Sequence, residues 1–173
     1  NLYQNGKWEY AKANDSLRVV DTSNSLTRTN NSDFIKGKSS TYLVKSKKLK
    51  VGVYIDPDHW GVTPRGINEP AEFNFTMKEF DILASLITEK VSFPLEDLAD
   101  LIFQNAKNQS VDAEVLKKEY RIVNGVKILC MQMKMTVKGM NFIYFTYNFS
   151  NKNGTAQLTC VTNAMLFNKN YQK

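Results

Sequence analysis

The stretch that decides the fold is residues 119–163, which read EYRIVNGVKILCMQMKMTVKGMNFIYFTYNFSNKNGTAQLTCVTN. It contains two pairs of apolar runs, and a short segment ending in glycine separates the members of each pair. Asn-Gly between apolar runs is the strongest short-range signal for a β-hairpin, because a type I′ turn requires positive φ at both central residues. We therefore predict two hairpins: Glu119–Val123 with Val126–Thr136, and Asn141–Phe149 with Thr155–Thr162.

Four segments upstream of these hairpins have the patterns of β-strands. Apolar and polar residues alternate in them, and turn-forming residues separate them. They are Thr41–Lys45, Leu49–Ile55, Ala71–Thr76 and Phe80–Lys90. The last segment also fits one face of a helix, and its neighbouring strands favour the strand interpretation.

Two helices are predicted. Pro94–Lys107 carries an apolar stripe at helical spacing and two acidic residues in its first turn, where they favour the positive end of the helix dipole. Pro94 suits the first helical position, with the cap at Ser92 or Phe93. A last helix is expected to begin near Asn163 and to run to Lys173.

The order of strands, helix, strands and helix predicts an α+β fold with a central antiparallel sheet flanked by helices, an α/β/α sandwich. We expect one such domain over residues 41–173. Residues 1–40 are rich in Asn, Ser, Thr and Lys, and they predict an irregular N-terminal arm with one short strand near Leu17–Asp21.

Composition restricts the class of protein. The chain of 173 residues has 42% hydrophobic residues and a net charge of +6. No apolar run approaches the roughly 18–20 residues that span a bilayer, so no transmembrane segment is expected. Because the sequence opens without Met, we expect a leader to have been removed and the protein to be exported, to the periplasm or outside the cell. Cys130 and Cys160 fall in strands separated by a third, which predicts reduced thiols.

The segment 56–70 is a candidate binding loop. It holds three prolines and two glycines, and long structured loops are often functional. In one interpretation Asp56 and Asp58 form turns, and the side chain of Trp60 closes the edge of the core. In another, the only histidine is the centre of a hydrolase-type site completed by Glu72 or Glu89. No metal or cofactor is expected. The candidate residues are Asp56, Asp58, His59, Trp60 and Arg65.

A methionine stripe offers a second candidate site. Met131, Met133 and Met135 fall on one face of a predicted strand. Such a stripe most often packs under a helix, here Pro94–Lys107. Flexible thioether side chains can also line an adaptable apolar cleft or bind copper(I), and the cleft is kept as a candidate.

Much of the excess positive charge lies in residues 36–50, and the candidate contact residues there are Lys45, Lys47, Lys48 and Lys50. This cluster can dock peripherally on an anionic surface, or it can be a solvated strand edge that discourages aggregation. Because no stacking aromatic residues lie between the lysines, no nucleic-acid partner is expected.

The run KKEYRIVNGVKILCMQM, followed by KGMNFIYFTYNFS, NGTAQLTCVT and a helix with Phe167, resembles the PsbP-like α/β/α sandwich family. That group includes an extrinsic photosystem II subunit, a nuclear Ran-binding import factor and exported bacterial proteins. The resemblance covers roughly residues 40–173. It implies a non-enzymatic binding or assembly module, and it assigns no functional residue. We expect the partner to be another protein or an apolar ligand.

Overall fold

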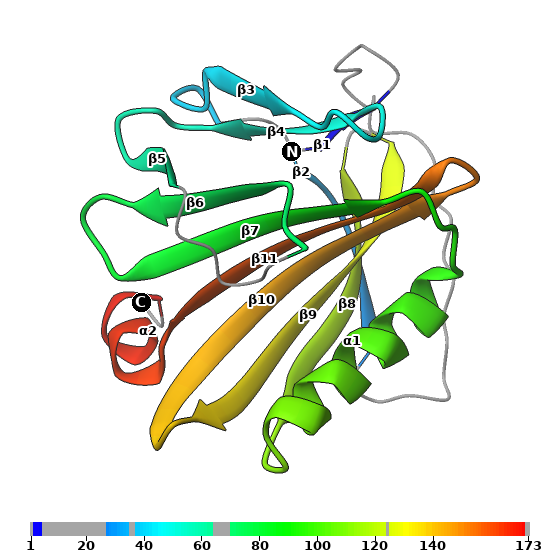
Figure 1. The fold of residues 1–173 in the computed structure, drawn as a ribbon. Helices are drawn as coiled ribbons and strands as arrows, with labels where there is room; N and C mark the ends of the chain where they lie inside the picture. The colour runs from blue at the N-terminus through cyan, green and yellow to red at the C-terminus, as the bar shows by residue number, and fades with distance from the viewer. Residues whose placement is uncertain (1, 5–26, 35–36, 64–69, 124, 172–173) are drawn as a thin grey trace.

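The computed structural model describes residues 2–4, 27–34, 37–63, 70–123 and 125–171. Within these residues the strands form two sheets (Figure 1). The larger sheet has eight strands in the order β2-β8-β9-β10-β11-β7-β6-β5, and the smaller has three in the order β1-β4-β3. All neighbouring strands are antiparallel except β2 and β8, which run parallel.

Both predicted hairpins are present, with longer strands than the sequence indicated. They are β8 (Glu114–Val123) with β9 (Val126–Val137) and β10 (Met140–Asn151) with β11 (Gly154–Asn163). A third tight turn joins them into one meander, because Val137 pairs with Met140. Lys138 and Gly139 have φ angles of 50° and 79°, as a type I′ turn requires.

The remaining predicted strands are also present. They are β3 (Tyr42–Lys45), β4 (Val51–Ile55), β6 (Phe73–Met77) and β7 (Ile82–Glu89). β7 pairs with β11 over its whole length, so tertiary pairing resolves the helix-or-strand ambiguity of residues 80–90 in favour of a strand. The segment 56–70 was expected to be a loop, and this is wrong for residues 60–63. They form β5 (Trp60–Thr63), which pairs with β6.

The helix α1 covers Leu95–Gln109, close to the predicted bounds. Pro94 is its N-cap and not its first helical residue, so the predicted cap at Ser92 or Phe93 is wrong by one or two positions. The second helix, α2, covers Ala164–Tyr171 and follows β11 directly.

The N-terminal region contributes strands to both sheets. β1 (Leu2–Gln4) pairs with β4, and β2 (Thr27–Phe34) pairs with β8. The expectation of an irregular arm is therefore wrong for these two segments. The short strand predicted at Leu17–Asp21 lies outside the described residues.

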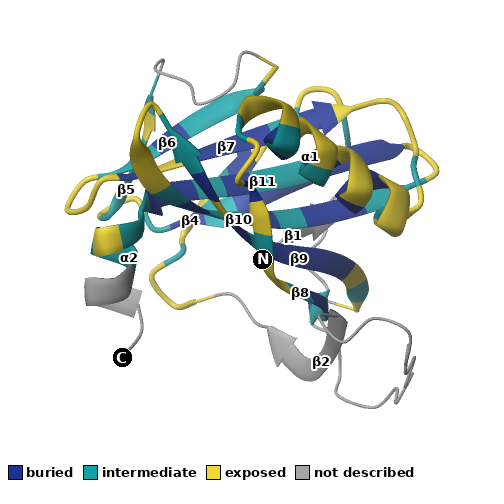
Figure 2. Cartoon of the chain, turned by 90° about the horizontal axis from the view of Figure 1, so that it is seen from below, coloured by how far each residue is buried: buried dark blue, intermediate teal, exposed yellow. Residues whose placement is uncertain are grey.

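The two faces of the large sheet are covered differently. On one face the helix α1 lies across the sheet (Figure 2). It packs on β8, β9 and β10, around the methionines of β9. On the other face the small sheet packs over β6, β7 and β11, where Val53 and Ile55 meet Phe75 and Leu86. The helix α2 contacts only one end of this second face, through Phe167 against Phe145. The fold is thus α+β and mostly antiparallel, and a sheet takes the place of much of the second helical layer expected from sequence.

Candidate functional site

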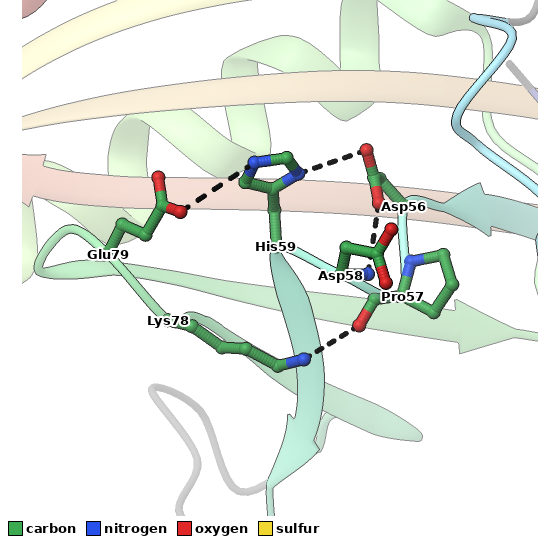
Figure 3. A network of polar contacts seen from close by, with 6 residues as sticks. All are labelled: Asp56, Pro57, Asp58, His59, Lys78 and Glu79. Carbon is green, nitrogen blue, oxygen red and sulfur yellow. Dashed lines mark hydrogen bonds and ion pairs between the residues drawn. The ribbon is translucent and has the colours of Figure 1, made fainter.

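The predicted binding loop forms a polar turn between β4 and β5 (Figure 3). The Nδ1 atom of His59 lies 3.0 Å from Oδ2 of Asp56, and its Nε2 atom lies 3.8 Å from Oε1 of Glu79 in the β6–β7 turn. Asp56 Oδ1 accepts a hydrogen bond of 3.0 Å from the backbone N–H of Asp58. Lys78 donates from Nζ to the carbonyl oxygen of Pro57 at 2.8 Å. These contacts join two turns that are about 20 residues apart in sequence.

The electrostatics of this cluster favour a charged histidine. The hydrogen bond that the His59 ring donates to Asp56, with the negative charges of Asp56 and Glu79, raises the pKa of His59 above its ordinary value. Hydrogen bonds from Ser39 and His59 lower the pKa of Asp56. A histidine held between two carboxylates has its protonated form stabilised, because both neighbouring charges are negative. The arrangement therefore acts as an ionic clamp between two turns.

Glu72, proposed as a catalytic partner of His59, is engaged elsewhere. Its carboxylate accepts hydrogen bonds from Ser46 Oγ at 2.7 Å, from Thr88 Oγ1 at 2.5 Å and from the backbone N–H of Lys47. The hydrogen bonds lower its pKa against the opposing effect of burial. Glu72 thus ties the β3–β4 turn to β7, away from the contacts made by His59. Arg65, the last residue of the predicted loop site, lies outside the described residues.

Next to the clamp, an apolar groove with a volume of about 510 Å³ lies on the second face of the large sheet. Its floor follows the strand register: Gln132, Phe145 and Cys160 are side by side on β9, β10 and β11. Two residues further along β11, Thr162 pairs with Ile82 of β7. Two walls come from Trp60 of β5 and Phe167 of α2. The remaining lining residues are Met77, Tyr147 and Val161.

The groove contains few polar atoms and no charged side chain among its lining residues. The hydroxyl of Thr162, a residue only 6% exposed, has no hydrogen-bond partner among the described residues. Gln132 is half-buried, and its amide faces the same side of the sheet as Phe145. Burial raises the pKa of Cys160 to about 12, so its thiol is protonated and weakly nucleophilic at neutral pH.

Sequence reasoning identified Trp60 but missed the rest of the groove. The available signal was the alternation of side chains between the two faces of a strand. Once the hairpin register is known, it places Phe145 and Tyr147 of one strand on the same face as Cys160 and Thr162 of the next. The contribution of β7 and α2 requires the strand order, which local patterns do not supply.

The methionine stripe lies on the opposite face. Met131, Met133 and Met135 are each 2–3% exposed and pack in the core beneath α1, in the arrangement that the core interpretation described. Met131 also borders a hollow of about 420 Å³ beside α1, which Asp100, Lys107 and other polar residues flank.

The four lysines of the predicted anionic-surface site are exposed and lie in or beside the β3–β4 turn. Ser46 Oγ accepts hydrogen bonds of 3.0 Å from the backbone N–H groups of Lys48 and Leu49, which fixes the turn that carries them. Lys48 Nζ lies 3.4 Å from the carbonyl oxygen of Thr88.

Within the described parts of the chain, no cluster of three or more His, Cys, Asp or Glu residues could hold a metal ion. A separate check of the helices found none, in those same parts, with the length and apolar character needed to cross a bilayer.

Comparison with solved structures identifies the fold. The solution structure of cyanobacterial PsbP (CyanoP) from Synechocystis sp. PCC 6803 matches with a TM-score of 0.54 and 14% sequence identity, over 77% of this chain and 86% of that one. The chain has a PsbP-like fold. A protein of unknown function from Pseudomonas aeruginosa, PA94, described as a putative regulator, matches with a TM-score of 0.45 and 12% identity, over 74% of this chain and 86% of that one.

The PsbP-like fold agrees with the resemblance seen in the hairpin sequence, and at this identity the likeness concerns the fold alone. No protein-family model matches the chain, and no curated protein matches it either.

Proposed function

We propose that this chain is a non-enzymatic binding or assembly module that contacts another protein through the corner formed by the β4–β5 and β6–β7 turns. One observation carries the proposal. His59 is clamped between Asp56 and Glu79 while its neighbour Trp60 lines an apolar groove, so an ordered polar surface borders an apolar one. Aromatic side chains with an apolar body and a polar edge are enriched at protein interfaces.

The hydrolase alternative has less support from the geometry. Among the described residues, the ion-pair partners of the His59 ring are the carboxylates of Asp56 and Glu79, and neither can act as the nucleophile that a Ser-His-Asp arrangement requires. The two thiols lie in strands, and burial raises the pKa of each to about 12. A thiol with so high a pKa is a poor nucleophile near pH 7.

A pull-down with the full chain as bait, using a lysate of its source cells, tests the proposal. The bait variants are Trp60→Ala and His59→Ala, with the exposed α1 residue Gln104→Ala as the matched control. We expect the control to retain the partners of the wild type and both loop variants to lose them. Retention of the same partners by both loop variants would remove this corner from the binding surface.

A second surface is favoured by the ordering of the lysine turn, because Glu72 and Ser46 hold its backbone in place. We propose that it adds peripheral contact with anionic surfaces. Elution from heparin should then move to lower salt in the variant Lys47→Gln/Lys50→Gln. Lys134→Gln/Lys138→Gln is a charge-matched control, with both exposed lysines at the β9–β10 end of the sheet. If the salt concentration of elution falls equally in both double variants, heparin binding depends on net charge and not on the lysine turn.

A further inference from the structure

We propose that the groove on the second face of the sheet binds a small, uncharged and largely apolar molecule that carries one hydrogen-bonding group. This deepens the proposed function by assigning the groove its own ligand. It concerns a different set of residues from the clamped corner, with Trp60 as the shared member.

The size and lining of the groove fit such a molecule. Its volume of about 510 Å³ falls within the range of about 300–1,000 Å³ that is usual for small-molecule sites. Four aromatic residues come from three different elements: Trp60 of β5, Phe145 and Tyr147 of β10 and Phe167 of α2. Phe145 and Phe167 already contact each other at 5.4 Å between ring centroids, tilted by 46°, so they form one continuous aromatic corner. Planar apolar molecules pack well against rings in offset or tilted arrangements.

The lining of the groove disfavours an ionised ligand head. None of the side chains that line it carries a charge. An anion or cation transferred to such a surface would lose its hydration without gaining a partner, which is strongly unfavourable. The charged groups at its β8 border are already paired with one another. Arg121, 5.6 Å from the centroid of the Tyr147 ring, is ion-paired with Glu119, and Lys117, opposite Gln132 in the sheet, lies 2.9 Å from the same carboxylate.

Two polar side chains mark where the ligand is recognised. Gln132 brings an amide, which can both donate and accept, to the floor beside Phe145. Thr162 is 6% exposed and its hydroxyl has no hydrogen-bond partner among the described residues. Native proteins rarely leave a buried hydroxyl unpaired, so the Thr162 hydroxyl is available to a water molecule or to a polar group of a ligand in the groove. The pairing of Thr162 with Ile82 places it on the floor, next to Cys160 along β11.

The neutral fluorescent probe N-phenyl-1-naphthylamine suits a test, because it is apolar, has two aromatic parts and carries a single N–H donor. Fluorescence titration of the full chain should give saturable binding of one probe per chain. The variant Cys160→Phe fills the groove and should weaken binding at least tenfold. Gln132→Leu keeps the side-chain size and removes the amide, and it should weaken binding about two- to tenfold, the effect of one neutral hydrogen bond. Gln104→Leu, on the exposed face of α1, is the matched control and should bind as the wild type does.

Circular dichroism and thermal unfolding establish that each variant is folded, and Gln132→Leu keeps the test decisive if Cys160→Phe does not fold. Absence of saturable binding would overturn the proposal. If Cys160→Phe folds and binds the probe with unchanged affinity, the proposal is overturned, because the probe then occupies another site. If Cys160→Phe does not fold, unchanged affinity in Gln132→Leu overturns the proposal for the same reason. The pull-down with Gln132→Leu as bait separates the two proposals: retained protein partners together with weakened probe binding would mean that the groove and the corner act independently.

Discussion

Replacement of Gly154 by Ala is the sharpest test of how β7 and β11 are packed. Gly154 opens β11 with φ of 145°, a conformation that side chains rarely adopt. A Cβ atom added there would lie inside contact distance of the Glu89 carbonyl oxygen, 2.9 Å from Leu49 Cδ2 and 3.2 Å from the carbonyl carbon of Glu89. The backbone would have to move at the Thr155–Glu89 pair that begins the β7–β11 ladder.

The magnitude follows from two separate costs. The unusual φ costs about 1–3 kcal/mol for a residue with a side chain. Overpacking against a backbone that can move only with its whole strand costs about 1–3 kcal/mol more. Gly139→Ala is the matched control, because Gly139 also has positive φ (79°) but has no atom within 4 Å of the added Cβ. Its expected cost is about 1–2 kcal/mol.

Urea and thermal unfolding of the wild type and both variants measure these costs. We expect Gly154→Ala to be destabilised more than Gly139→Ala, by about 1–3 kcal/mol. For a domain of this size that corresponds to a melting temperature lower by about 2–12 °C. Equal destabilisation of the two variants would refute the close approach of β11 to Glu89, and with it the described packing at this end of the sheet.

Three further predictions concern ionisable groups. Hydrogen bonds from Ser110 and Thr136 lower the pKa of Asp112 from 3.8 to about 2, so the stability that its carboxylate adds should be present above about pH 4 and lost as the pH falls through 2. Thermal unfolding should therefore separate wild type from Asp112→Asn at pH 7, with a gap that narrows below pH 4; a gap independent of pH would contradict this. Because the pKa of His59 is raised, its stabilising charge should be present below pH 6.5 and lost as the pH rises through the folded pKa, and NMR titration should show a lower pKa in Asp56→Asn. An unchanged histidine titration would show that the clamp is absent. Both cysteines should resist Ellman's reagent at pH 7 and give two equivalents after unfolding, whereas rapid reaction in the folded state would conflict with the raised pKa values.

Local signals predicted the hairpins because their information is local. In residues 119–163 the strands alternate and glycines end the turns, so neighbours in sequence are neighbours in the sheet. The helix α1 was predictable for the same reason, from its stripe of apolar residues and its acidic first turn.

The elements that were missed depend on partners far away in sequence. β2 reads TRTNNSDF, which has no apolar alternation, and it becomes a strand by pairing with β8 across about 90 residues. β5 has four residues and no β pattern of its own, and it is defined by pairing with β6. The small sheet over the second face likewise follows from tertiary packing of Val53 and Ile55 on Phe75.

The candidate site was predictable only in part for the same physical reason. The polar residues around His59 cluster in sequence, so the turn was visible as a pattern. Its partner Glu79 comes from another turn, and the proposed partner Glu72 is bound by Ser46 and Thr88 instead. The groove draws its lining from β5, β6, β7, β9, β10, β11 and α2, so only the complete strand order reveals it.

The central claim is that the sheet face opposite α1 presents a site for an apolar molecule, and amide NMR mapping tests it most directly. Addition of N-phenyl-1-naphthylamine to the ¹⁵N-labelled chain should move the indole N–H signal of Trp60, the side-chain amide of Gln132 and the backbone amide of Thr162. The signals of Gln104 and Asn105 on the exposed side of α1 should stay in place. Shifts confined to α1, or no shift at a saturating concentration of the probe, would contradict the account.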